Sequence, residues 1–201
     1  MFVTGMAVLT IGSANATSIS FANPTGDLGT SHVYGPITAY GFTAELTGPY
    51  AGDFKAANLF GKHGGGDENG LGLTYTNDNE INAPAGSQAI VLNVNALMGQ
   101  DLKIGFGSVQ DGEGWRVGFS NSMMLPNNES AFSGYVNGST EFPALFDFGV
   151  RNSRYLIIEA TSKDVLLTSL SYTAVPEPAS MALVGVGLIG LGYIRRRAAR
   201  G

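Results

Sequence analysis

Residues 102–119 read LKIGFGSVQDGEGWRVGF, and apolar side chains recur at every second position at both ends of this segment. Leu102, Ile104 and Phe106 alternate with polar or small residues, and the same spacing returns at 115–119. An alternation with a period of two is typical of a β-strand with one buried face, because successive side chains point to opposite faces. Glycine and aspartate between the two runs favour turns. The segment therefore predicts two short strands joined by turn residues.

The same alternation recurs through most of the chain. It is clear at 90–95 and at 166–172. Further candidate strands lie at 18–22, 37–44, 71–76, 145–150 and 155–160. No segment before residue 179 has the periodicity of a long amphipathic helix, although residues 51–60 have room for one helical turn. Nine or so short strands predict an all-β fold, an antiparallel two-sheet sandwich of jelly-roll-like type.

Composition excludes several classes of site. The chain has 201 residues and no cysteine, so it has no disulfides, no Cys-ligated metal centre and no thiol nucleophile. The formal net charge is −5, and the segment 17–174 alone carries 15 acidic and 7 basic residues. An acidic protein lacks the many lysine and arginine contacts with phosphate that nucleic-acid binding requires. We therefore expect no nucleic acid among its partners.

The first residues have the pattern of an export signal. Residues 1–16 read MFVTGMAVLTIGSANA, an uncharged apolar run that ends in small residues and is followed by polar Thr17 and Ser18. This is the layout of the apolar region and cleavage site of a signal peptide, without the basic region that normally comes first. We expect residues 1–16 to be a signal peptide whose basic part lies upstream of this start, and the exported chain to begin near Thr17.

The last 27 residues form a second targeting segment, VPEPASMALVGVGLIGLGYIRRRAARG. The apolar stretch 179–194 predicts a transmembrane helix about 24 Å long, shorter than a hydrocarbon core of about 30 Å. The arginines at 195–197 stop the apolar run at once. Positive residues of this kind favour the cytoplasmic side, so the segment 17–174 is expected to face away from the cytoplasm as an ectodomain.

This order of parts resembles a PEP-CTERM protein-sorting signal. The sorting motif covers 175–180, the helix 179–194 follows, and the basic tail is 195–201. The residues that carry the resemblance are Val175, Pro176, Glu177, Pro178, Arg195, Arg196 and Arg197. The resemblance implies that the chain is a substrate of exosortase, a membrane-embedded protease of Gram-negative bacteria. It also implies transient anchoring in the inner membrane, cleavage near 176–178, and transfer to the cell surface or release, typically in organisms that make exopolysaccharide.

These patterns lead us to expect an exported surface or extracellular-matrix protein that is not an enzyme and is associated with exopolysaccharide or biofilm. The alternative is a secreted carbohydrate-active hydrolase with a carboxylate pair. Its candidate residues are Asp111, Glu113, Glu141 and Asp147. Aromatic residues suited to stacking on sugars are Trp115, Phe132, Tyr135, Phe142 and Tyr155, of which Trp115 is expected in the core.

A cation site is the remaining candidate. The glycine run 61–72 is expected to be a loop, and two acidic clusters flank the strand that follows it. Their oxygen-bearing side chains suggest a structural calcium site formed by Asp67, Asn69, Asp78 and Glu80. No other cofactor is expected. His32 and His63 have no supporting motif, so we expect both to be loop or surface residues.

Overall fold

The computed structural model describes residues 15–44, 54–66, 68–74, 78–83, 87–110, 112–123, 135–139, 146–150 and 152–174, together with Gly185 and Gly187. The chain divides into two compact units, residues 16–174 and a second unit made of 1–15 and 175–201. The first unit contains every strand that the structure describes. The fold below is that of residues 16–174.

Fifteen strands and one short 3-10 helix, η1, are present among the described residues. In chain order they are β1 (Ala16–Ser20), β2 (Gly26–Asp27), β3 (Ser31–Tyr34), β4 (Ile37–Ala44), β5 (Phe54–Ala57), β6 (Leu59–His63), β7 (Asn69–Leu73), β8 (Ile81–Asn82), β9 (Gln88–Asn93), η1 (Asn95–Leu97), β10 (Asp101–Gly107), β11 (Gly114–Ser120), β12 (Tyr135–Gly138), β13 (Phe146–Val150), β14 (Tyr155–Ser162) and β15 (Asp164–Thr173).

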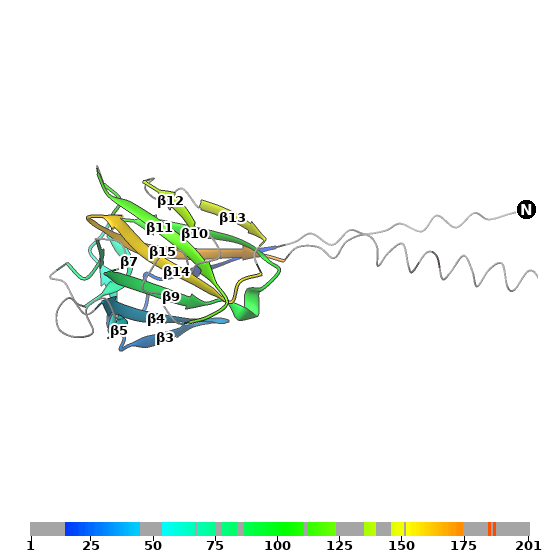
Figure 1. Ribbon diagram of the computed structural model, residues 1–201, viewed down its shortest axis with the longest axis horizontal. Helices are drawn as coiled ribbons and strands as arrows, with labels where there is room; N and C mark the ends of the chain where they lie inside the picture. Colours follow the sequence, from blue (N-terminus) through cyan, green and yellow to red (C-terminus); the bar gives the residue numbers. More distant parts are fainter. Residues whose placement is uncertain are drawn as a thin grey trace, which may run out of the picture. The chain divides into compact units, whose positions relative to one another are not determined.

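The strands form two antiparallel sheets. The first has the order β13-β10-β15-β7-β6-β2, and both β1 and β8 also pair with β15. The second has the order β12-β11-β14-β9-β4-β3, with β5 on β4. The sheets lie as two layers, one in front of the other in Figure 1. The predicted all-β antiparallel sandwich is therefore confirmed, and its jelly-roll-like connectivity stays a prediction.

The two runs that opened the sequence lie in different sheets and meet across the core. β10 belongs to the first sheet and β11 to the second, so their alternating apolar side chains face each other. The rings of Phe106 and Trp115 stack with centroids 4.3 Å apart and an interplanar angle of 11°. Both side chains are 1% exposed. The prediction that Trp115 is a core residue is confirmed.

The region of the glycine run differs from the expectation. Residues 54–57 and 59–63 are strands β5 and β6, not a helical turn. β6 then pairs with β7, so much of 61–72 is a hairpin, not a loop. The glycines hide the strand pattern because neighbouring backbone lies where side chains would be. A Cβ at Gly61 would be 2.0 Å from the carbonyl oxygen of Pro24.

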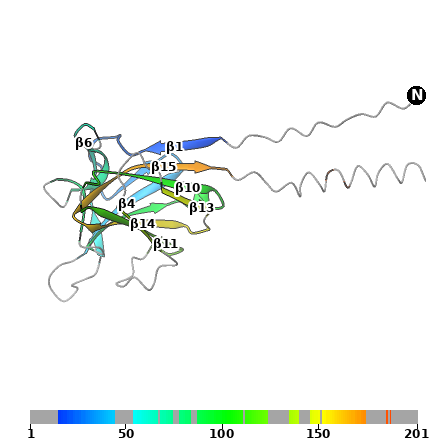
Figure 2. The ribbon, with the colours of Figure 1, turned by 90° about the horizontal axis from the view of Figure 1, so that it is seen from above.

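The two ends of the domain lie side by side. β1 pairs with the last half of β15, with Ala16 opposite Thr173 and Ser20 opposite Ser169 (Figure 2). The other end of β15 begins at Asp164, which pairs with Asn82 of β8. β15 therefore runs from the chain termini of the domain to a group of polar loops.

Candidate functional site

Glu80 is the centre of the polar site at the Asp164 end of β15. The residues before β8 cross β7 at Gly72, where a Cβ would lie 2.1 Å from the carbonyl oxygen of Asn79. A glycine is needed for this close approach, since any larger residue would collide with the crossing backbone. The crossing brings Glu80 inward, and its side chain is only 3% exposed.

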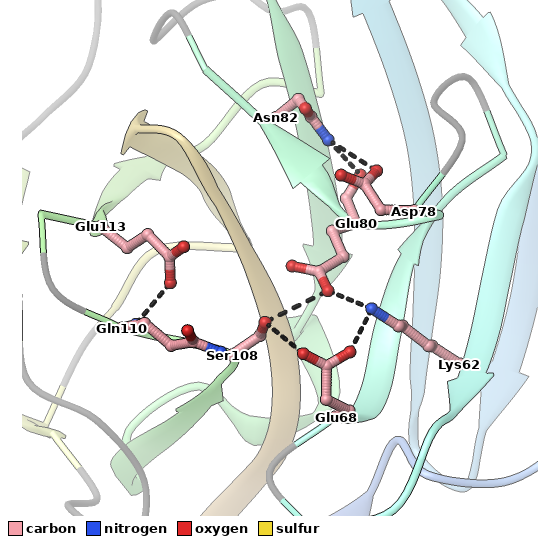
Figure 3. Close-up of polar contacts among 8 residues, drawn as sticks. All are labelled: Lys62, Glu68, Asp78, Glu80, Asn82, Ser108, Gln110 and Glu113. Atoms are coloured by element: carbon pink, nitrogen blue, oxygen red, sulfur yellow. Dashed lines mark hydrogen bonds and ion pairs between the residues drawn. The ribbon is translucent and has the colours of Figure 1, made fainter.

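Two side chains from separate segments contact this buried carboxylate, and a third residue, Glu68, contacts both of them (Figure 3). The ammonium group of Lys62, on β6, forms ion pairs with both Glu68 and Glu80 Oε1. The hydroxyl of Ser108, just after β10, lies 3.2 Å from Glu80 Oε1 and 3.2 Å from Glu68 Oε1. It can donate its one proton to either carboxylate. The network joins β6, β7, β8 and β10 into one unit.

Burial and charge act against each other in this network. Burial raises the pKa of Glu80, while the hydrogen bond and charge of Lys62 and the hydroxyl of Ser108 oppose the rise. For Lys62, desolvation alone would lower the pKa, but the hydrogen bonds and charges of Glu68 and Glu80 outweigh it and leave the pKa raised. The ammonium group is therefore held in its charged form by the two carboxylates.

A pair of aspartates lies beside the network. Burial raises the pKa of Asp164 to about 7, and a hydrogen bond with Asp78 and the charges of Glu80, Asp78 and Glu113 add to the rise. A hydrogen bond between two carboxyl groups requires a proton on one of them. Asp78 Oδ1 also lies 3.4 Å from the amide Nδ2 of Asn82. Two carboxyl groups are thus in direct contact at this end of the sandwich.

We call Glu68, Asp78, Glu80, Glu113 and Asp164 the acidic cluster. In this cluster, Glu80 Oε2 is buried and has no hydrogen-bond partner. A buried carboxylate oxygen without a donor is unfavourable, since its desolvation is not compensated. Among the described residues, no group of three or more His, Cys, Asp or Glu side chains lies so that it could hold a metal ion.

The predicted calcium ligands are partly brought together. Asp78 and Glu80 both lie in the acidic cluster, while Asp67 lies outside the described residues. Asn69 is on β7, where its Nδ2 donates to the carbonyl oxygen of Gly66 at 2.8 Å. Sequence reasoning did not identify Lys62, Ser108 and Asp164. Ser108 has one backbone signal, a φ of 52° that only a structure reveals.

The predicted hydrolase carboxylates do not meet in the described part of the chain. Asp111 and Glu141 lie outside it. Glu113 accepts a hydrogen bond from the backbone N–H of Gln110, in the acidic cluster. Asp147 lies on β13 and pairs with Lys103, near the start of β10, at 2.9 Å. Asp147 and Glu113 are separated by the part of β10 that follows Lys103, whose residues each add about 3.3 Å.

The two histidines are surface residues with different settings. His63 ends β6 and is exposed. His32 lies on β3 instead of in a loop, is half-buried, and packs edge-on against Tyr34 with ring centroids 4.8 Å apart.

Partly exposed aromatic side chains gather on the outer face of the second sheet. There a small buried cluster of Ala89, Val91 and Ile157 points away from the main core. The aromatic residues packed around it are Tyr40, Phe42, Phe54 and Tyr155. Of the predicted aromatic candidates, Tyr155 belongs to this face, the side chain of Tyr135 is outside the description, and so are Phe132 and Phe142.

The sorting motif begins where the sandwich ends. β15 ends at Thr173, and the motif residues 175–178 and arginines 195–197 lie outside the described residues. Within the predicted helix 179–194, the described Gly185 and Gly187 are helical. In the described part of the chain, no helix is both long and apolar enough to cross a bilayer.

Comparison with known families confirms the nature of the C-terminal segment. Residues 174–197 match the family described as the PEP-CTERM protein-sorting motif. A comparison with curated proteins found no match. The motif implies export and anchoring through the C-terminal region, with exosortase as the processing partner.

Proposed function

We propose that this chain, which carries the PEP-CTERM sorting motif, is a surface or extracellular-matrix protein that exosortase cleaves from a transient inner-membrane anchor. The observation that carries the proposal is the position of the motif. It starts at residue 174, directly after β15 ends at Thr173. The described β-sandwich thus precedes the sorting segment, and cleavage at 176–178 would lie after the last of its described strands.

A non-catalytic role fits the polar network. Lys62 and Ser108 both contact Glu80, whose side chain is 3% exposed, so this carboxylate does not face solvent as a general acid or base would. Each of its partners comes from a different segment of the chain. The contacts therefore serve to hold strands and loops together.

Contact with exopolysaccharide is supported by the outer face of the second sheet. Tyr40 and Tyr155 are partly exposed there, and both pack on the small apolar cluster that includes Val91. Aromatic rings held by packing offer flat surfaces that lose little conformational freedom on binding a sugar ring. We assign this face, with Phe42 and Phe54 beside it, to the polysaccharide contact.

Sorting is tested by replacing the motif in the native host. The variant E177A/P178A is expected to accumulate uncleaved in the inner membrane, while wild type is shortened and reaches the surface. The variant P36A, which changes an exposed proline far along the chain from the motif, should be processed like wild type. Fractionation and immunoblotting report both results. Normal cleavage and surface delivery of E177A/P178A would show that sorting does not depend on the motif.

The polysaccharide contact needs its own test. The full chain is mixed with exopolysaccharide from the producing organism and sedimented with it. The variants Y40A and Y155A are expected to reduce co-sedimentation several-fold, while V33A, at an exposed valine on β3, should not. Equal retention of all variants would exclude this face. Release of sugar fragments would instead support the hydrolase alternative.

A further inference from the structure

The sorting motif follows the last strand of the sandwich with a very short spacer. β15 is paired up to Thr173, which lies opposite Ala16 of β1 on one side and opposite Asp101 of β10 on the other. Only two residues separate Thr173 from Pro176, the first proline of the motif. The residue that ends β15 therefore lies between two neighbouring strands, close in sequence to the bonds that are to be cleaved.

A protease needs more of the chain than this spacer offers. An extended peptide binds in a cleft through its backbone hydrogen-bonding groups, over several residues. Backbone groups at the end of β15 that pair with β1 and β10 are not available for such binding. Cleavage at 176–178 therefore requires the last residues of β15 to leave the sheet for a time, and folded proteins are cleaved through such local openings.

Strand β1 opposes this opening, although it is itself weakly held. All five of its residues pair with β15. Four of the five side chains are exposed, and Ile19 is the one that is partly buried against the core. The hydroxyl groups of Ser18 and Ser171 lie 3.1 Å apart and add one hydrogen bond between the two strands. β1 thus contributes backbone pairing with little apolar burial, which is typical of a segment that opens at low cost.

We propose that β1 controls the rate at which exosortase cleaves this chain, with Ile19 as the positioning residue. This inference rests on the proposed function, because it requires exosortase to cut just after β15. While β1 is paired, it holds one side of the end of β15 in the sheet (Figure 2). Ser18 and Ser171 are 153 residues apart in sequence, so the pairing forms only when both ends of the domain have come together. Folding of the sandwich therefore slows its own release.

The test follows cleavage of the full chain in the native host by pulse labelling and immunoprecipitation. I19A removes the side chain of β1 that packs on the core, so β1 opens more often and the cleaved form is expected to appear about fivefold faster. The control V109A truncates a buried core residue that follows β10, and it accounts for a general loss of stability. V109A should be cleaved at the rate of wild type.

A longer spacer separates control of access from a merely structural role of Ile19. Insertion of Gly-Ser-Gly-Ser after Ala174 supplies a flexible segment, so this variant should be cleaved at least as fast as I19A, and I19A should add nothing to it. Equal rates in wild type, I19A and the insertion variant would overturn the proposal. So would equal rates in V109A and I19A, or an effect of I19A that persists with the insertion. None of these results affects the proposed function, which E177A/P178A tests.

Discussion

Phe106 and Trp115 belong to opposite sheets, yet their rings stack with centroids 4.3 Å apart. This contact places the strongest apolar alternation of each sheet at the centre of the sandwich. It also links two strands that are joined in sequence by only six residues, 108–113. The turn between them therefore carries the chain from one layer to the other.

Removal of the Phe106 ring should cost much of the domain's stability. F106A leaves a cavity beside Trp115, and truncation of a fully buried phenylalanine costs about 3–5 kcal/mol of unfolding free energy. Denaturant unfolding followed by Trp115 fluorescence measures the loss. V33A, at a residue 64% exposed, should change the free energy by less than about 0.5 kcal/mol. Similar values for the two variants would contradict the core position of Phe106.

Replacing Lys62 should lower the free energy of unfolding far more than replacing Lys103. K62M leaves the buried carboxylate of Glu80 without its cation, and breaking a buried ion pair costs about 3 kcal/mol or more. K103M breaks an ion pair with Asp147, whose side chain is 52% exposed, and should cost less than about 1 kcal/mol. Urea unfolding at neutral pH compares them. The double variant K62M/E80Q should recover part of the loss, and failure to recover any would show that Glu80 is not the residue left uncompensated.

Asp164 should make the domain less stable as pH rises. Its pKa is raised to about 7 in the fold from an ordinary value of 3.8, so between these values the folded state binds more protons than the unfolded state. The contribution is fully present below the ordinary pKa and is lost as pH rises through about 7. In a calcium chelator, the Tm of the full chain should be higher near pH 5 than near pH 8. The change of Tm with pH reflects Asp164 together with Asp78, Glu80 and Glu113, whose charges raise the pKa of Asp164.

D164N tests the assignment of this pH dependence. Its amide does not titrate, so the difference in Tm between the two pH values should shrink. D147N removes a carboxyl whose pKa is lowered by Lys103, and it should leave the fall toward pH 8 in place. A full difference in D164N would assign the pH dependence to another group.

Gly72 should tolerate no side chain. In G72A the new Cβ would lie 2.1 Å from the carbonyl oxygen of Asn79, which is backbone and cannot turn aside. The crossing segment must then move, and with it Glu80. We expect a loss of about 2 kcal/mol or more, by analogy with overpacked cores. G185A, where nothing lies within 4 Å, should leave unfolding of the sandwich unchanged. A neutral G72A would mean that the crossing does not depend on this contact.

Strong alternation predicted the central strands well. The expected strand at 37–44 is β4 with the same bounds, and the run at 102–106 lies within β10. β5 and β6 were missed because their residues do not alternate clearly and the glycines of β6 lie against other backbone. Periodicity records which side chains face the core. It does not record a close approach between backbones.

The candidate site was predictable only in part. Asp78 and Glu80 stood out because both are acidic and near in sequence. Lys62 and Ser108 are 46 residues apart and meet at Glu80 only because β6 and β10 end at the same edge of the fold. No pattern in the sequence singled out Asp164. Such proximity is a product of the strand order, which a single sequence does not reveal.

Because Ala16 pairs with Thr173, the first and last strands of the domain meet at the same end of the sandwich. The first and last strand residues of the domain lie at one pole, and Asp164 lies nine residues away along β15, roughly 30 Å at about 3.3 Å per residue. A domain held by its C-terminal tail is thus tethered at the pole opposite the acidic cluster. The acidic cluster's Asp164, at the other end of β15, is the part of this strand farthest in sequence from the sorting segment.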